Sequence, residues 1–338
     1  MSNATITDIA NDVKMSIATV SRVLNNADYP VKEETKKRIL EAADRLGYVP
    51  NMFAKGLKTK TSNEIAVIIP LIKNPFYTSF AGGVEGELSN SSYYMSLYTT
   101  EYLEMQTDSL VNKLIGSAVA GVIIVSDSMT QHMYNSLYKM NKTRQIPVVT
   151  VGHKSDYNEL PGLFCDYTMG AKKMIDYLFE KGHQKIAFAF GSMNRETSWA
   201  KWVGVQLAYK ERGIELDPYY LGAERNDILS GTALAHTIMK SGKGYTAIAA
   251  ANDVLATGIL TGLKEQNISV PDDISVTGYN NSLYAQVCYP PLTTLHIPSW
   301  GMGASALKML TEMLATKIEP KSIFWDTQVI ERASVRPI

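Results

Sequence analysis

The first 50 residues alternate apolar and polar positions with the period of short α-helices. A first stripe of apolar residues recurs at intervals of three and four positions, which predicts the buried face of one helix. The stripe consists of Ile6, Ile9, Ala10 and Val13. Thr5 stands just before it and Asp8 three positions after Thr5, which is the pattern of a capping box. The sequence therefore predicts a helix that begins after Thr5.

A second short helix is predicted after the turn Val13-Lys14-Met15, with Ser16 as its N-terminal cap. Its inward positions are expected to be Ala18, Val20, Val23 and Leu24. Its outward or terminal positions are expected to be Ile17, Thr19, Ser21, Arg22 and Asn25. Two helices joined by so short a turn are typical of a helix-turn-helix, whose second helix enters the DNA major groove. The alternative is a small helical bundle whose polar side chains are only solvated.

Several residues of the second helix have the chemistry that DNA contacts require. Arg22 suits a bidentate contact with guanine, and Ile17 and Ala18 suit a thymine methyl group. Short polar side chains suit phosphate oxygens. Those on this helix are Ser16, Thr19, Ser21 and Asn25.

From Glu64 onward, short β-rich runs alternate with longer helical patterns. The expected strands are Ile65–Pro70, Tyr94–Tyr98, Val122–Val125, Pro147–Val151, Lys185–Phe190, Ala247–Ala250 and Ile274–Gly278. The expected helices are Tyr77–Asn90, Leu103–Ser117, Met129–Asn141, Tyr167–Lys181, Thr197–Arg212, Leu229–Ser241 and Asp253–Gln266. Two such series predict an α/β fold with two parallel sheets wound with helices, and a ligand cleft at the carboxyl ends of the strands.

Charge and cysteine content narrow the class of protein. The 338 residues carry no net charge, but residues 1–60 hold ten Lys and Arg against seven Asp and Glu, so +3 there leaves −3 for the remainder. This excess of positive charge lies where DNA contacts are expected. Only two cysteines are present, Cys165 and Cys288, which favours a reducing cytoplasm over a disulfide framework. We expect neither a signal peptide nor a membrane span.

The motifs of common enzymes are absent from the sequence. It contains no GxxxxGK[ST], no GxGxxG after a strand, no HExxH and no GxSxG. The five histidines, at 132, 153, 183, 236 and 296, lack the spacing of metal ligands. We therefore expect no catalytic residues, no metal and no cofactor.

Three segments of the first 60 residues resemble the headpiece of the lactose-repressor/galactose-repressor (LacI/GalR) family of bacterial transcription regulators. They are TITDIA, SIATVSRVLN and EETKKRILEAADRLGYVPN. Further family landmarks follow, among them Asn74-Pro75-Phe76-Tyr77 and Gly278-Tyr279-Asn280-Asn281. The resemblance implies an all-α headpiece (1–48), a hinge (49–62) and a two-lobed periplasmic-binding-protein-like core (63–338). The N-lobe would comprise about 63–163 and 295–327, and the C-lobe about 164–294 and 328–338.

The same resemblance assigns DNA contacts residue by residue. Ile17, Ala18 and Arg22 would read bases. Contacts with the DNA backbone would come mostly from Ser16, Thr19, Ser21, Asn25, Thr35 and Tyr48. Thr5 and Asn51 would contact the DNA beside them. In the hinge, Leu57 would wedge between base pairs of the minor groove, with Ala54 and Lys55 also in the groove. This segment is too short to be helical alone, so it would fold only on DNA; a plain basic linker is the alternative.

Two positions in the headpiece depart from the family pattern. Lys14 replaces the usual Gly of the turn, where a positive φ would cost free energy. Lys32 replaces the usual Ser cap of the third helix, although Glu33 and Glu34 still complement the helix dipole. Both departures concern local stability.

The family's effector-lining positions can also be carried over to the core. They correspond to Asn74, Phe76, Arg195, Trp199, Lys201, Asn252 and Asn280. Forked polar groups and a flat apolar face suit a sugar, and Phe76, Trp199 or Trp202 would supply that face. For each Trp the alternative is packing of its helix onto the sheet, and this is expected more for Trp202 than for Trp199. Lys201 and Asn280 replace the Arg and Asp common in sugar-binding relatives, and Gly152 replaces another Asp. The cleft is thus less acidic than in a typical monosaccharide binder, which leaves a larger or differently shaped sugar open. Ala54-Lys55-Gly56-Leu57 and Asn74-Pro75-Phe76-Tyr77 are also similar to the catabolite-control branch of the family, so a phosphoprotein corepressor is the other alternative.

A regulator of this kind needs two headpieces. One helix-turn-helix contacts only a few base pairs, so a homodimer on a near-palindromic operator is expected. The chain ends at Ile338 without the leucine heptad of some tetrameric relatives. Effector binding would change the angle between the lobes and move the two hinges. A solute-binding protein is the rival from another class, and the headpiece argues against it.

Overall fold

The computed structural model describes most of the chain in two compact units, Met1–Ser62 and Asn63–Ile338. The described residues are 4–24, 30–49, 62–89, 91–100, 107–125, 127, 129–154, 158–193, 195–216, 221–223 and 225–338. Five expected DNA-contacting residues lie outside these ranges. They are Asn25, Asn51, Ala54, Lys55 and Leu57.

The described residues of the first unit form three helices, α1 (Ile6–Val13), α2 (Ile17–Leu24) and α3 (Glu33–Arg45). The predicted capping box is confirmed, because the Asp8 N–H donates to Thr5 Oγ1 (3.3 Å) and the Thr5 N–H donates to Asp8 Oδ2 (2.8 Å). The helices share one small apolar core. Its buried members are Ile9, Ala10, Val13, Val20, Val23, Ile39, Ala42 and Ala43.

The two departures in the headpiece have visible consequences. Lys14 ends α1 in the left-handed conformation at φ 53°, which disfavours any residue with a Cβ atom. Lys32 precedes α3 without a side-chain cap, and Glu33 and Glu34 occupy the first turn. Ser16 caps α2 as predicted, since its Oγ accepts from the Thr19 N–H at 3.1 Å.

One inward assignment on α2 was wrong. Val20 and Val23 are buried, but Ala18 is exposed. Residues two positions apart on a helix lie about 200° apart around its axis, so Ala18 faces away from Val20. Its methyl group is thus on the outer surface together with Ile17.

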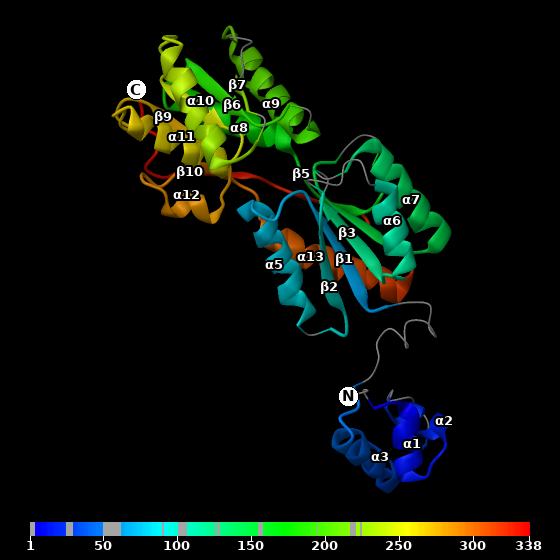
Figure 1. The fold of residues 1–338 in the computed structure, drawn as a ribbon. Helices are drawn as coiled ribbons and strands as arrows, with labels where there is room; N and C mark the ends of the chain where they lie inside the picture. Colours follow the sequence, from blue (N-terminus) through cyan, green and yellow to red (C-terminus); the bar gives the residue numbers. More distant parts are fainter. Residues whose placement is uncertain are drawn as a thin grey trace. The chain divides into compact units, whose positions relative to one another are not determined.

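The second unit contains two six-stranded sheets, each the centre of one lobe (Figure 1). The N-lobe sheet is entirely parallel and has the strand order β11-β5-β4-β3-β1-β2. Its strands are β1 (Glu64–Ile69), β2 (Tyr94–Thr99), β3 (Gly121–Val125), β4 (Val148–Gly152), β5 (Gly162–Cys165) and β11 (Ile323–Trp325). Its helices are α5 (Pro75–Leu88), α6 (Thr107–Gly116), α7 (Gln131–Arg144) and α13 (Ser299–Thr316).

The C-lobe sheet has the order β12-β10-β9-β8-β6-β7, and only β12 runs antiparallel to its neighbour. Its strands are β6 (Ile186–Phe190), β7 (Leu221–Gly222), β8 (Ala247–Ala250), β9 (Ser275–Asn280), β10 (Thr293–His296) and β12 (Gln328–Ile330). Its helices are α8 (Tyr167–Glu180), α9 (Glu196–Arg212), α10 (Ile228–Lys240), α11 (Asp253–Glu265) and α12 (Leu283–Val287). The predicted two-sheet α/β fold class is confirmed.

The chain passes between the lobes three times, at Asp166, at Ile297-Pro298 and at Asp326-Thr327. The second passage lies two residues later than the expected boundary before Leu295. Leu295 and His296 still pair with Tyr279 and Asn280 in the C-lobe sheet, which keeps β10 whole within that lobe.

Helix α13 was not among the expected elements, and it closes one face of the N-lobe sheet. It packs against α5 through glycines: a Cβ atom at Gly83 would lie 2.1 Å from the Trp300 carbonyl oxygen, and one at Gly303 2.0 Å from the Phe80 carbonyl oxygen. The two helices therefore approach closely because these positions carry no side chain.

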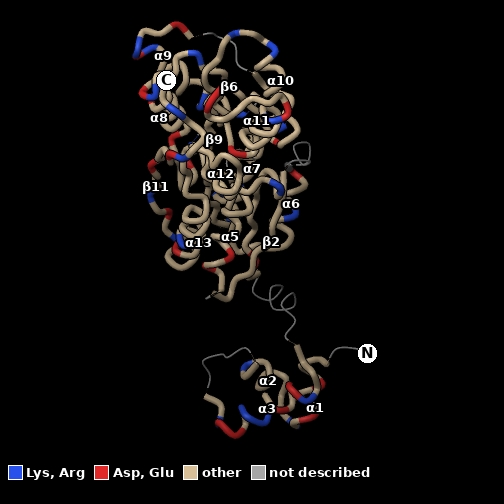
Figure 2. Tube along the Cα trace, turned by 90° about the vertical axis from the view of Figure 1, so that its left-hand side faces the viewer, with Lys and Arg blue, Asp and Glu red and all other residues tan. Residues whose placement is uncertain are grey.

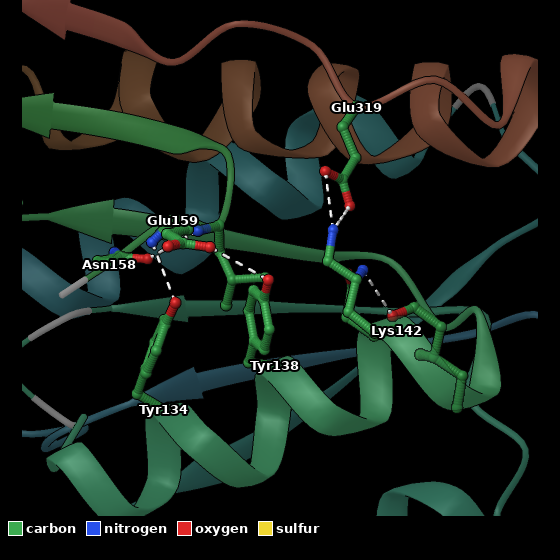
Figure 3. Close-up of polar contacts among 9 residues, drawn as sticks. Tyr134, Tyr138, Lys142, Asn158, Glu159 and Glu319 are labelled. Carbon is green, nitrogen blue, oxygen red and sulfur yellow. Dashed lines mark hydrogen bonds and ion pairs between the residues drawn. The ribbon is translucent and has the colours of Figure 1, made fainter.

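The segment after α13 is tied to α7 on the other face of that sheet (Figure 3). Lys142 Nζ contacts both oxygens of Glu319, at 2.9 and 3.2 Å. Next along α7, Tyr138 donates to Glu159 Oε2 (3.1 Å), and the Tyr134 hydroxyl accepts from the Glu159 N–H (3.1 Å). Glu319 stands before β11, so its contact with Lys142 joins the segment that leads to β11 to α7. No helix among the described residues is long and apolar enough to cross a membrane.

Candidate functional site

The outer surface of α2 presents the residues expected to read bases. Ile17 is 53% exposed, and Ala18 and Arg22 are exposed as well. Ser16 and Thr19 lie at the start of the helix with their hydroxyl oxygens 2.8 Å apart. A helix with two small apolar groups and a guanidinium on one open surface is suited to the major groove.

The other expected headpiece contacts lie around α2 with different exposure. The Thr5 hydroxyl is held by Asp8 Oδ2 at 2.7 Å. Ser21, Thr35 and Tyr48 are half-buried, and Tyr48 packs against the headpiece core. Acidic and basic residues follow one another in blocks along α3 (Figure 2).

In the second unit, the carboxyl ends of several strands bring polar groups together between the lobes. Tyr77, on α5 after β1, donates to Asp127 Oδ2 at 2.7 Å, and Asp127 follows β3. Burial and the Asp127 carboxylate raise the pKa of the Tyr77 hydroxyl well above its usual value, while the positive charge of Arg195 acts in the opposite direction. Tyr77 is therefore a neutral donor, and Arg195 lies within electrostatic reach of it.

Lys201, on α9 of the C-lobe, points its ammonium into the same region. Its Nζ lies 4.0 Å from the centroid of the Tyr279 ring and 5.3 Å from that of Tyr167, and it donates to the Ala251 carbonyl oxygen at 2.8 Å. Burial lowers its pKa to about 8, although the carboxylates of Asp127 and Asp253 favour the charged form. Lys201 is thus a desolvated cation that lies over two aromatic rings and donates to a backbone carbonyl.

The Tyr167 and Tyr279 rings lie next to this ammonium. Their rings are stacked, with centroids 5.9 Å apart and an interplanar angle of 9°. Both are buried within an apolar cluster that also includes Phe76 and Tyr77 of the N-lobe. We refer to Tyr77, Asp127, Tyr167, Lys201 and Tyr279 as the lobe junction.

A second polar group surrounds the start of α11. The Asn252 side chain caps that helix by accepting from the Leu255 N–H (2.9 Å) and donates to Asn226 Oδ1 (2.9 Å). Next to it, Asp253 accepts from the Thr294 hydroxyl at 2.5 Å and the Ser282 N–H at 2.6 Å. Burial raises the pKa of Asp253 to about 6 against these hydrogen bonds.

The structure also gives the positions of the remaining expected effector residues. Asn74 caps α5 by accepting from the Phe76 N–H at 3.0 Å. Phe76 is 6% exposed and contacts the Tyr77 ring edge-on, so its ring is mostly covered. Trp199 is 49% exposed on the first turn of α9, whereas Trp202 is buried against Phe188 and Phe190, as expected. Asn280 ends β9 with φ 103° and is half-buried.

The sequence analysis did not nominate Asp127, Tyr167 or Asn226. Asp127 could have been found from its place, because it follows the third strand of a parallel sheet at the edge where ligands bind. Tyr167 and Asn226 carry no such signal, since each becomes a neighbour only through the packing of distant elements. Among the described residues, no three His, Cys, Asp or Glu side chains gather into a possible metal site.

Comparisons with known proteins agree with the two-unit organisation. Residues 5–51 match the model of "Bacterial regulatory proteins, lacI family", and residues 175–335 match the "Periplasmic binding protein-like domain". The chain is 31% identical to catabolite control protein A of Priestia megaterium, with 95% of this chain and 96% of that protein covered. It is 28% identical to the transcriptional repressor CytR of Escherichia coli K12, with 99% and 97% covered.

Two solved structures illustrate the likeness of fold. The lac repressor dimer bound to operator and the anti-inducer ONPF has a TM-score of 0.86 at 22% identity, covering 99% of this chain and 100% of the other. The transcriptional regulator CelR in complex with cellobiose has a TM-score of 0.72 at 25% identity, covering 98% and 99%. The relatives RegA, CytR and PurR, which match this chain over nearly its whole length, are named as transcriptional regulators or repressors.

Proposed function

The chain belongs to the lacI family of bacterial regulatory proteins, and we propose that it binds an operator through α2 and responds to a neutral sugar at the lobe junction. Members of the family are transcription regulators with a DNA-binding headpiece and an effector-binding core, and this chain has both parts. The finer assignments concern which residues read DNA, what the effector is and how the chain assembles.

The exposed surface of α2 supports the assignment of base contacts. Arg22 would take a guanine, and the methyl groups of Ile17 and Ala18 would lie against thymine. These two apolar side chains remain exposed, although Val20 and Val23 of the same helix are buried. The two apolar groups stand next to each other on a helix of eight residues, so they form one small apolar surface that suits a thymine methyl group.

The observation that carries the effector proposal is the state of Asp127. One carboxylate oxygen accepts from Tyr77, whereas Oδ1 is buried and has no hydrogen-bond partner among the described residues. An unpaired buried carboxylate oxygen costs free energy, which a ligand donor would recover. Lys201, by contrast, needs hydrogen-bond acceptors. Its ammonium has three N–H donors, and one of them donates to the Ala251 carbonyl oxygen.

A hydroxyl group satisfies both demands, because it accepts a hydrogen bond and donates one. Adjacent hydroxyls of a sugar would accept from Lys201 and donate to Asp127, and the exposed Trp199 offers an apolar face nearby in the chain. The charges of Lys201 and Asp127 offset each other, so the ligand itself need not be charged. CelR, a relative in fold, was solved with cellobiose.

We propose that the functional unit is a homodimer. Four large apolar side chains on or next to α10 and α12 are strongly exposed in the single chain: Leu229 (81%), Leu283 (67%), Val287 (67%) and Tyr289 (94%). Burial of such residues stabilises an interface by roughly 25 cal/mol per Å² of apolar surface. Sedimentation equilibrium of the full chain tests the proposal, and a monomer at micromolar concentration counts against it.

The experiment for function has two steps. Duplexes are first selected from a random library with the full chain at fixed salt, and Arg22→Ala serves as the variant that should lose selectivity. A panel of sugars and sugar phosphates is then titrated into the complex with the selected duplex. Relief or strengthening of binding by one neutral sugar, lost in Asp127→Ala, supports the proposal.

The other outcomes separate the parts of the proposal. Selective DNA binding that no sugar changes would favour a phosphoprotein corepressor, the alternative raised by the sequence. Selective binding that only a sugar phosphate changes would contradict a neutral effector. Binding without any sequence selectivity would contradict the assignment of α2.

A further inference from the structure

A groove crosses the end of the C-lobe that is opposite the lobe junction. It consists of three adjoining hollows of about 400, 330 and 380 Å³. The first and second share Lys243 and Tyr245, and the second and third share Tyr209 and Leu216, so the hollows follow one another in a line. They lie at the amino ends of β6 and β8, near the C-terminal ends of α9 and α10.

The floor of the groove is apolar and its rim is basic. Ile186, Phe188 and Tyr209 are buried at the bottom. The rim carries four exposed lysines and one acidic residue, Glu215. The lysines are Lys185, Lys210, Lys240 and Lys243. Lys and Arg also recur at this end of the molecule in Figure 2, beside α9 and α10.

Helix dipoles explain only part of this arrangement. Lys210 and Lys240 stand in the last turns of α9 and α10, where a cation complements the negative end of the dipole. Lys185 precedes a strand, so no dipole accounts for it. Lys185, Lys210 and Lys240 form no ion pair with another described residue, whereas Lys172 and Lys173 on α8 of the same lobe do.

We propose that this groove binds an extended acidic segment of a partner protein. Carboxylates of the segment would meet the lysines along the rim, and apolar side chains between them would enter the successive hollows. The walls also offer Gln184, Gln206 and Thr237, which can hydrogen-bond the main chain of a bound peptide. The line of hollows suits an extended chain better than a compact ligand.

The same features disfavour nucleic acid as the occupant. Single-stranded nucleic acid needs aromatic faces on which bases can stack. Here Tyr209 is 3% exposed, its hydroxyl donates to the Gln184 carbonyl oxygen at 2.9 Å, and its ring packs edge-on against Phe188. Trp202, at the third hollow, is 4% exposed. The Tyr209 and Trp202 rings therefore form a floor for aliphatic side chains, and Tyr245, which lines two of the hollows, is half-buried.

The test uses the full chain and fluorescein-labelled peptides of defined sequence. One peptide alternates Glu with Leu or Val, and a second alternates Lys with the same residues. The third peptide has the residues of the acidic peptide in scrambled order, with Gly inserted between them. An oligothymidylate of matched length probes the nucleic-acid alternative. Binding is measured by fluorescence anisotropy at two salt concentrations with the wild-type chain and two variants.

The variants are Lys185→Glu combined with Lys240→Glu, and the control Lys264→Glu. Lys264 is also exposed in the last turn of a C-lobe helix, but it lies outside the three hollows. The acidic alternating peptide should bind the wild-type chain, and its affinity should fall as the salt concentration rises. The double variant should bind it about tenfold or more weakly, whereas the affinity of Lys264→Glu should stay near that of the wild type. Amide hydrogen exchange should slow at Gln184–Ile186 and at the end of α10 when the peptide is present.

Several results would overturn the proposal. The acidic and the scrambled peptide could bind equally well, or Lys264→Glu could lose as much peptide affinity as the double variant. The oligothymidylate could bind this groove more tightly than the acidic peptide, or the peptide could bind without slowing the exchange of these amides. Melting temperatures of the three proteins verify that the exposed substitutions leave the fold intact. The measurement needs neither the operator nor the sugar, so it stands apart from the test of those assignments.

Discussion

Replacing Lys201 by Met should change how the stability of the protein depends on pH. Burial holds the pKa of Lys201 at about 8 in the folded chain, against a usual value of 10.5. Between these values the unfolded chain binds more protons than the folded chain, so the free energy of unfolding rises with pH. Below pH 8 the folded protein carries the full cost of a buried ammonium, which is about 3 kcal/mol.

The size of the effect between two practical pH values follows from the same two pKa values. At pH 7, Lys201 is protonated in most folded and nearly all unfolded molecules. At pH 9.5, most folded molecules have released this proton and most unfolded ones have kept it. Wild-type protein should therefore gain about 2 kcal/mol relative to Lys201→Met over this interval. Met has a similar stem and does not titrate.

Urea unfolding of both proteins at pH 7, 8, 9 and 9.5 measures this difference, since other titrating groups cancel between them. Lys201→Arg is the second variant, because Arg keeps its charge over the whole range and should also lack the rise. Parallel pH profiles of wild type and Lys201→Met would refute the idea that this ammonium is desolvated. If a sugar accepts from Lys201, effector affinity should also fall as the pH rises through about 8.

Three further outcomes are expected. Arg22→Ala should weaken binding to the selected duplex by about 1–3 kcal/mol and relax preference at one base pair, measured on duplexes with single substitutions; uniform weakening on all sequences would mean a phosphate contact instead. Lys14→Gly should raise the stability of the headpiece by about 1 kcal/mol in thermal unfolding, because φ 53° suits Gly, and no gain would mean that the turn is not strained. Leu283→Glu should shift the chain toward monomer in sedimentation, while the same change at exposed Ile318 should not.

Local sequence rules predicted the headpiece well because its helices are specified by neighbours in the chain. The capping box of Thr5 and Asp8 and the cap at Ser16 are bonds over three positions, which a pattern can read directly. The strained Lys14 was also visible, since it stands where a turn needs a positive φ. The error at Ala18 arose because a small residue fits both faces of a helix.

The sequence did not predict α13, and the reason is physical. Glycines near its start, including Gly301 and Gly303, lower helix propensity and interrupt the apolar stripe. Gly303 lies where α13 approaches α5 at a distance that no side chain allows, whereas Gly301 faces the Trp325 ring. A requirement set by another helix, more than 200 positions away, cannot be read from local periodicity.

The lobe junction could not be predicted fully from the sequence for the same reason, and its geometry suggests how the effector acts. The N-lobe supplies the pair Tyr77 and Asp127, and the C-lobe supplies Lys201 with its two stacked tyrosines. A ligand that accepts from Lys201 and donates to Asp127 therefore adds a bond between lobes that the chain links by only three passages. Such a ligand binds more tightly to the lobe angle that brings these groups within reach. If the ligand changes operator affinity through this angle, operator binding changes ligand affinity by the same factor. Asp127→Ala should accordingly abolish the response to effector and leave operator affinity without effector nearly unchanged.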